Sequence, residues 1–300
     1  MVLKIARLME WNLRKYLLGQ NTYTVGFGSF KIALDLRTPG ISRTLAIHRA
    51  RERDHTLIFK TEVAKGMRVL DIGANIGYYT MMAATLVGRN GKVFAFEPDP
   101  RNLNILELAL RANPGIANIV EIHPLAVSNR VGETIFYQTA ASNLNTLIHG
   151  EQKQTINRFS VKTITVDEFL ANKGGTINFV RMDIEGSEIE AVEGMLNTLK
   201  LSEVPCKLLI ETHPDTYSYP DRDFGLRLET LYSIGFKPKI IISAGEAIPE
   251  EFSKRGYKPS RIMREGRFLR GFFENVARDH VIYFVTHVPK LVRYILLIKE

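Results

Sequence analysis

The sequence has a single cysteine, Cys206, and no run of 18 apolar residues among its 300. One thiol excludes an internal disulfide framework and a thiolate cluster for zinc or iron–sulfur. The short apolar runs exclude a transmembrane helix, and the charges scattered through residues 1–20 argue against a signal peptide. We therefore expect a cytoplasmic protein in a reducing compartment.

Positive charge exceeds negative charge only in two short segments of the sequence. The formal net charge of +8 comes from two segments, with +3 in residues 1–20 and +5 in residues 251–270. The second segment interleaves Phe252, Tyr257 and Phe268 with its basic residues. This mixture suits an anionic partner, either RNA held by phosphate contacts and stacking or an anionic glycan or lipid head group. A solvated loop or hairpin is the plain alternative.

The spacing of apolar residues predicts an α/β protein. We expect an amphipathic helix over residues 3–18, a hairpin over 22–37 and a helix over about 44–64. From Arg68 onward, short apolar strands alternate with helices, which is typical of a mostly parallel sheet covered on both faces. The expected strands are 69–72, 93–97, 119–127, 177–183, 208–212, 240–243 and 281–286. The expected helices are 76–88, 100–112, 187–200 and 222–234. A capping box of Ser187 and Glu190 would begin the helix over 187–200.

No composition shift marks a sharp domain boundary. We expect an N-terminal helix and hairpin extension over residues 1–65 and one large domain over 66–300, with insertions at 131–165 and 244–270. Residues 3–18 and 288–298 are apolar enough to form terminal amphipathic helices. Such helices offer a homodimer contact or a peripheral anchor at a membrane surface.

A glycine turn between a strand and a helix is the strongest local signal. Asp71 ends the strand, and Gly73, Asn75 and Gly77 follow it. Glycine lets the backbone approach a ligand, and the following helix N-terminus offers unpaired N–H groups. Glu97 ends the next strand, 20 residues after Gly77, where a carboxylate would bind a ribose diol.

Two cofactors compete for this turn. A dinucleotide site has three glycines in G-x-G-x-x-G spacing, whereas here position 75 is Asn and the spacing is G-x-x-x-G. A carboxylate at Asp71 would repel a pyrophosphate but could pair with an ammonium group. S-adenosylmethionine has an ammonium, a ribose and a sulfonium and no phosphate, so the electrostatics favour it.

Together with further blocks along the chain, these residues make the sequence resemble the FkbM-type S-adenosylmethionine-dependent methyltransferases over about residues 53–214. Arg181 stands where that family often has lysine. The resemblance is carried by Val69–Thr80, Ala95–Pro98 with Asn102, Leu125–Ser128, Ile164–Leu170, Met182–Glu188 and Ile210–His213.

The resemblance implies a Rossmann-like class I methyltransferase fold, with seven strands of which the last is antiparallel. It also implies roles by position. Gly73, Asn75 and Gly77 would shape the cofactor turn, and Asp71 would hold this turn and face the methionine end of the cofactor. Glu97 would bind the ribose, with Pro98 and Ala126 beside the adenine. Asp183 would lie near the sulfonium.

Three residues at strand ends are the catalytic candidates: Asp183, Glu211 and His213. Side chains at the carboxyl ends of strands in an open α/β sheet face the ligand crevice. Asp183 could act as general base or as an oxygen ligand for a divalent ion, and we assign no metal site. His213 suits proton abstraction near neutrality. Glu188 is interpreted as a helix-terminus charge.

We therefore expect O-methylation of a hydroxyl on a small molecule or sugar. The block after the fourth strand, Met182 to Glu185, lacks the Asn/Asp-Pro-Pro-aromatic run common in base-nitrogen methylation. Two alternatives stay open. One is an RNA methyltransferase that uses residues 251–270, and the other is a non-catalytic, cofactor-binding scaffold.

Overall fold

The computed structural model describes the whole chain except residues 1, 39, 141–143, 149–154, 218–221 and 289. The chain forms two compact units that interleave along the sequence. The first unit contains residues 1–51, 63–126 and 134–162, and the second contains residues 52–62, 127–133 and 163–300. The expected division at residue 65 stays a prediction.

The first unit begins with the expected amphipathic helix. Helix α1 (Val2–Asn12) continues into a π-helical turn, Leu13–Leu17. The apolar face of this segment is exposed, with 66% of Met9 and 74% of Tyr16 accessible. Trp11 lies on the opposite face, is buried, and meets Tyr23 edge-on at 6.2 Å between ring centroids. The predicted hairpin is present as β1 (Thr22–Phe27) and β2 (Phe30–Asp35), and α2 (Ile41–His48) follows.

Three parallel strands form the centre of the first unit. They are β3 (Arg68–Ile72), β4 (Lys92–Phe96) and β5 (Val120–His123), paired in that order. Helices α4 (Tyr78–Val87) and α5 (Pro100–Arg111) make the crossovers, with a 3-10 turn at Pro114–Ile119. The strand expected over 119–127 breaks at Pro124, which has no N–H to donate to a ladder.

A separate three-stranded sheet carries the polar insertion. Its strands are β6 (Ala126–Val127), β7 (Gly132–Thr139) and β8 (Thr155–Ile164), in the order β6-β8-β7. Ala126, Phe136 and Val161 form its small apolar cluster. Strands β7 and β8 lie within the insertion expected over residues 131–165.

The second unit contains six strands in the order β9-β10-β14-β11-β13-β12. Strands β9 (Phe179–Met182) and β10 (Cys206–Glu211) are parallel, and β14 (Val292–Lys299) runs antiparallel to β10 and to β11 (Lys237–Ser243). With β3, β4 and β5 these four give seven strands, the number that the family resemblance implies, and the last of them, β14, is antiparallel. The hairpin of β12 (Arg261–Glu265) and β13 (Phe268–Glu274) adds two more. The α/β class is confirmed.

Two C-terminal predictions are wrong. Residues 278–286 form helix α11 (Arg278–Thr286) rather than a strand, because Val281, Phe284 and Val285 recur at helical spacing and are all buried. Residues 288–298 were expected as an amphipathic helix, but most of them form β14. Its apolar run is buried on both sides, as in a central strand. This segment is therefore no terminal helix for a dimer contact or membrane anchor.

Two expected helices are each divided in two. The helix over 44–64 is interrupted between α2 and α3 (Arg53–Glu62), where Arg49 and Glu52 have left-handed backbone at φ 54° and 42°. The helix over 187–200 divides at Gly194 into α7 (Glu188–Glu193) and α8 (Leu196–Leu201). The capping box is absent, because the Ser187 side chain makes no cap hydrogen bond.

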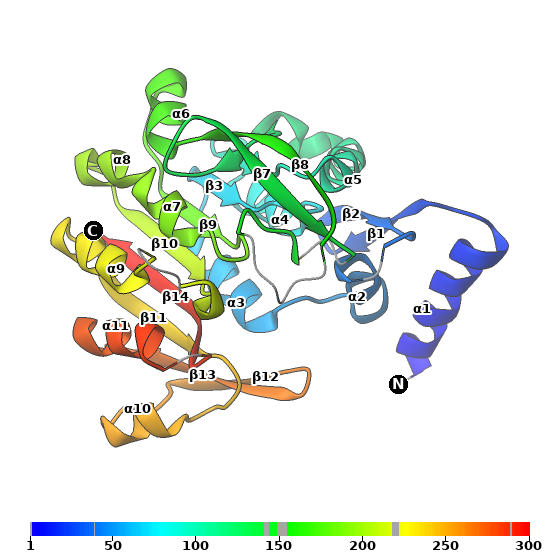
Figure 1. The fold of residues 1–300 in the computed structure, drawn as a ribbon. Coiled ribbons are helices and arrows are strands. Elements are labelled where there is room, and N and C mark those ends of the chain that lie inside the picture. The colour runs from blue at the N-terminus through cyan, green and yellow to red at the C-terminus, as the bar shows by residue number, and fades with distance from the viewer. Residues whose placement is uncertain (1, 39, 141–143, 149–154, 218–221, 289) are drawn as a thin grey trace. The chain divides into compact units, whose positions relative to one another are not determined.

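The remaining helices of the second unit cover its strands. Figure 1 shows α9 (Phe224–Ser233) and α11 side by side, and α11 packs on β11. Phe252 is fully buried and stacks on Phe273 at 4.0 Å between ring centroids, with Phe284 at 4.3 Å. The helices are α6 (Val166–Lys173), α9 (Phe224–Ser233) and α10 (Glu250–Lys254), with a 3-10 turn at Pro214–Thr216. None of the helices in the described part of the chain combines the length and apolar character that a membrane span needs.

Candidate functional site

The glycine turn of the first unit depends on left-handed backbone. Gly73, Asn75 and Gly77 have φ of 84°, 52° and 88°. The N–H groups of Gly73 and Ala74 both donate to the Phe96 carbonyl at 3.0 Å, which joins the turn to the end of β4. A Cβ at Gly77 would also collide with the Leu106 side chain. The residue types at these positions are therefore required by the turn itself.

Glu97 is held beside this turn, as its spacing predicted. The Asn75 N–H donates to Glu97 Oε2 at 2.8 Å, and the Asp99 N–H donates to Oε1 at 2.9 Å. Asn102 donates to the same Oε1 at 3.3 Å. Burial raises the pKa of Glu97 to about 7; the charge of Asp99 also raises it, and the N–H donors oppose the shift. The carboxylate is rigidly positioned at the carboxyl end of β4.

The other cofactor candidates also lie in the first unit. Asp71 is fully buried and accepts a 2.6 Å hydrogen bond from the Thr80 hydroxyl. Pro98 is half-buried directly after Glu97. Ala126 is buried in the cluster of the three-stranded sheet. All seven predicted cofactor residues therefore belong to this unit.

A polar network follows Glu97 that the sequence did not reveal. Asp99 is fully buried and caps α5 by accepting from the Arg101 N–H at 2.8 Å. Its carboxylate also accepts from Gln138 at 2.9 Å and from Asn145 at 2.7 Å. The partners lie about 40 residues away in the polar insertion, and no motif links them to Asp99.

The three catalytic candidates come together in the second unit. Asp183 follows β9, Glu211 ends β10 and His213 follows it. One ligand atom from each lies within 4.8 Å of the others. Asp183 Oδ2 is 2.5 Å from the buried guanidinium of Arg181, the residue that replaces the family's lysine. Arg293 from β14 forms an ion pair with Glu211.

The surroundings of His213 were not predicted. Its Nδ1 lies 2.9 Å from Oε1 of the buried Glu188, and its Nε2 lies 3.7 Å from carboxylate oxygens of Glu185 and Glu211. Burial lowers the pKa of His213, but Glu188 and the other carboxylates outweigh it and raise the pKa to about 10. With this pKa, the His213 ring keeps its proton at neutral pH.

Glu188 does more than place a charge at a helix terminus. Besides His213, its carboxylate accepts from the Gly186 N–H at 3.1 Å and from the Tyr217 hydroxyl at 3.1 Å. The side chain has no exposed surface. Glu188 thus fixes the orientation of the His213 ring.

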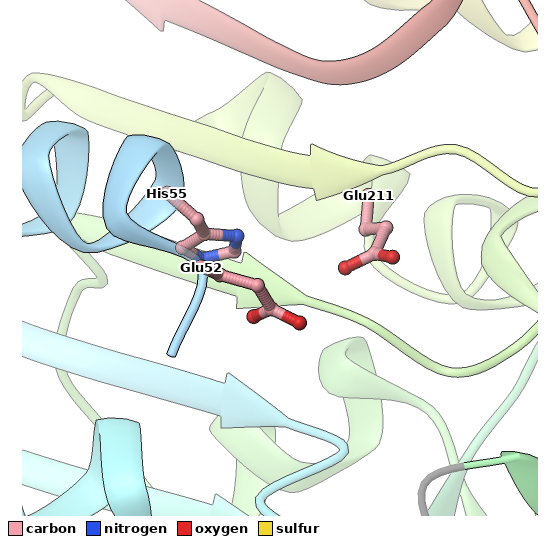
Figure 2. Close-up of side chains that lie close together, drawn as sticks. All are labelled: Glu52, His55 and Glu211. Atoms are coloured by element: carbon pink, nitrogen blue, oxygen red, sulfur yellow. The ribbon is translucent and has the colours of Figure 1, made fainter. Parts of the chain in front are cut away.

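A second group in the same unit shares Glu211. Glu52 and His55 each place one ligand atom within 4.8 Å of Glu211 and of each other, as Figure 2 illustrates. Glu52 precedes α3 and His55 lies in its first turn. Sequence reasoning missed both residues, because nothing in the local pattern links them to a strand that ends at residue 211.

The basic segment 251–270 contributes some of its side chains to the fold. Phe252 is in the core, and the Tyr257 hydroxyl lies 2.7 Å from His280 Nδ1. Arg270 is buried and pairs with Asp54 at 3.0 Å. The hairpin alternative is confirmed by β12 and β13. Of the three interleaved aromatics only Phe268 is exposed, at 39%, so the stacking platform expected for RNA is largely missing.

Solved structures resemble the chain only weakly. An FkbM methyltransferase from Methylobacillus flagellatus matches with a TM-score of 0.42 and 18% identity, over 69% of this chain and 43% of that one. The O-methyltransferase TomG from Streptomyces achromogenes matches with a TM-score of 0.41 and 12% identity, over 83% and 80% of the two chains.

Sequence comparison is more informative. The hexuronic acid methyltransferase AglP from Haloferax volcanii is 28% identical over 154 residues, which is 50% of this chain and 58% of that protein. The chain thus matches little more than half of that curated relative's length. The family described as the methyltransferase FkbM domain matches residues 71–258, well over half of the chain, from the glycine turn into the basic segment. The chain belongs to the FkbM methyltransferase family.

Proposed function

We propose that this protein uses S-adenosylmethionine to methylate a hydroxyl oxygen of a small molecule or sugar. The observation that carries the proposal is Glu97, held by the Asn75 N–H at the left-handed glycine turn. Family membership and the relative named as a hexuronic acid methyltransferase support it. A hexuronic acid is a sugar with several hydroxyl groups, in line with the expected acceptor class.

The residues of the first unit fit this cofactor. Glu97 would bind the ribose hydroxyls, and Asp71 would hold the turn and attract the methionine ammonium. The buried Asp71 carboxylate disfavours a pyrophosphate, which argues against the dinucleotide alternative. Pro98 and Ala126 would flank the adenine. When bound, the cofactor supplies an electrophilic methyl group on a sulfonium.

The second unit supplies the groups for the acceptor. We assign Asp183 as the general base for the hydroxyl proton, because it follows a strand end and lies in one group with Glu211 and His213. Glu211 would bind the acceptor hydroxyl. His213 would orient it from a ring fixed by Glu188.

Titration calorimetry with S-adenosylmethionine tests the cofactor half. We expect micromolar binding by the wild type and at least tenfold weaker binding by Glu97→Gln. Glu107→Gln, on the exposed side of α5, is the matched control and should bind like the wild type. Equal affinity of Glu97→Gln and the control would overturn the ribose role.

Turnover with free and oligosaccharide-linked glucuronic acid tests the acceptor half. Asp183→Asn should lose at least a hundredfold in rate while its cofactor affinity stays within twofold. Cofactor binding without turnover on any hydroxyl acceptor would favour the scaffold alternative. Salt-steep RNA binding with methylation of that RNA would favour the RNA alternative.

A further inference from the structure

We propose that the exposed apolar face of α1 and of the π-helical turn after it binds the surface of an anionic membrane. Eight large apolar side chains of this segment are exposed, with Val2 at 78% and Leu17 at 77% accessible. Five of them recur every three or four residues and so form one stripe along the helix. This apolar stripe consists of Val2, Ile5, Met9, Leu13 and Tyr16. The inference goes beyond the proposed function and does not rest on it.

The opposite face of α1 fixes how the helix is turned. Trp11 is buried, and α1 packs on α2. The Arg7 guanidinium donates to the Ile47 carbonyl at 3.2 Å, and the Arg14 guanidinium lies 4.8 Å from the centre of the Tyr23 ring. Because these contacts hold the other side of the helix against the first unit, the apolar stripe stays accessible.

The charge of the segment suits an anionic surface. Residues 1–20 carry a net charge of +3, and Glu10 is their only acidic residue. Arg14 engages Glu10 at 2.9 Å. Lys4 is exposed and Lys15 is partly exposed. Anionic head groups attract basic side chains that lie near a membrane surface, so the charges and the apolar stripe favour the same partner.

The length of the segment indicates a helix that lies on the membrane. Helix α1 has 11 residues and the π-helical turn has 5, whereas a spanning helix needs about 20 apolar residues. An apolar face combined with basic residues on the other faces is typical of helices in the plane of the interface. Tyr16 has an apolar ring and a polar hydroxyl, which suits the boundary between acyl chains and head groups.

A second copy of the chain fits the stripe less well. A symmetric dimer would bring two segments of charge +3 against each other. With a rise of about 1.5 Å per residue, the segment is about 25 Å long and about 10 Å wide. Such a face is well below the roughly 800 Å² that each partner buries in a stable interface. RNA also fits poorly, because bases stack on aromatic rings and Tyr16 is the single aromatic residue of the stripe.

The β12–β13 hairpin is the competing location for a membrane contact. It exposes Ile262, Phe268 and Leu269, and Arg264 pairs with Leu269 in the strand register. None of these three apolar side chains is more than 50% exposed. The hairpin therefore offers less apolar surface than α1, and we assign the contact to the apolar stripe.

Co-sedimentation of the full-length protein with lipid vesicles tests the proposal. Vesicles of pure phosphatidylcholine are compared with vesicles that contain about one-third phosphatidylglycerol. We expect at least tenfold tighter binding to the mixed vesicles, and weaker binding at high salt because ions screen the attraction. Lys4→Gln removes one exposed charge and should weaken binding to the mixed vesicles about fivefold.

A double variant tests the apolar stripe itself. Ile5→Gln combined with Met9→Gln should bind the mixed vesicles at least tenfold more weakly, because two apolar side chains no longer leave water on binding. Both positions are exposed and Gln is a good helix former, so the fold should be kept, with circular dichroism as the check. The matched control combines Ile262→Thr with Leu269→Thr in the hairpin and should stay within twofold of the wild type.

Four results would overturn the proposal. The first is a wild type that does not sediment with the mixed vesicles at millimolar lipid concentration, and the second is equal affinity for the two vesicle types. The third is loss of binding in the hairpin variant while the stripe variant keeps it. The fourth is a dimer, seen by light scattering, that the stripe variant separates into monomers. Because S-adenosylmethionine calorimetry is a separate readout, failure of this proposal is distinguishable from failure of the proposed function.

Discussion

Arg270 from β13 lies 3.0 Å from Asp54 at the start of α3, with side-chain exposures of 8% and 0%. Burial raises the pKa of Asp54, and Arg270 opposes that shift by favouring the charged form. The pair joins a helix near residue 50 to the hairpin of the basic segment. One of the seven basic charges of residues 251–270 therefore has a structural function.

Removing one partner of this pair should be strongly destabilising. Arg270→Ala leaves the Asp54 carboxylate buried and uncompensated, and we expect a loss of about 3–5 kcal/mol in the free energy of unfolding. Urea unfolding measures it. Arg267→Ala, at an exposed position of the same hairpin, should stay within about 0.5 kcal/mol of the wild type. Equal stability of the two variants would contradict the assigned function of the pair.

Two helix caps of the same residue type should differ in energy. Asp99 caps α5 and also binds Gln138 and Asn145, whereas Asp223 only caps α9 through the Leu226 N–H at 3.2 Å. Asp223→Ala should cost about 1 kcal/mol. Asp99→Ala should cost at least about 2 kcal/mol more, because buried amides lose a charged acceptor. Thermal and urea unfolding of both variants measure the difference. Similar losses in the free energy of unfolding would mean that the hydrogen bonds from Gln138 and Asn145 to Asp99 add nothing to stability.

Gly194 should not tolerate a side chain. Its φ of −72° suits any residue, but a Cβ there would collide with the Ser128 carbonyl. Gly194→Ala is expected to cost about 1–3 kcal/mol through overpacking. Gly115→Ala is the control, since a Cβ there meets nothing within 4 Å. If the two alanine variants unfold at the same urea concentration, the close approach is absent in solution.

Glu97 should make stability depend on pH. Its pKa is raised from 4.5 to about 7 by burial, so the folded chain keeps a proton that the unfolded chain releases above 4.5. By linkage, the contribution of this proton is present at low pH and is lost as the pH rises from 4.5 through 7. The stability difference between wild type and Glu97→Gln should shift by about 3 kcal/mol against the wild type across this window. Urea unfolding of both proteins at pH 4.5 and pH 8 measures it, and a constant difference would exclude the raised pKa.

Much of the alternating core was predictable, because short apolar strands and amphipathic helices differ in local periodicity. Strands β3, β4, β9, β10 and β11 appear within a few residues of their expected positions. The C-terminal errors have one physical cause: a short apolar segment fits either a buried strand or a helix, and local periodicity does not distinguish them. Only its neighbours β10 and β11 make residues 292–299 a strand.

The sequence by itself determined the glycine turn and the position of Glu97 beside it, because the left-handed residues and the acid are close along the chain and are joined by the Asn75 N–H. It also determined which strand ends carry Asp183, Glu211 and His213. Only the tertiary structure decided what surrounds them. Glu188 beside His213, Arg293 beside Glu211, and Glu52 with His55 come from distant elements. The charge state of a buried side chain depends on such through-space neighbours, and no local pattern encodes them.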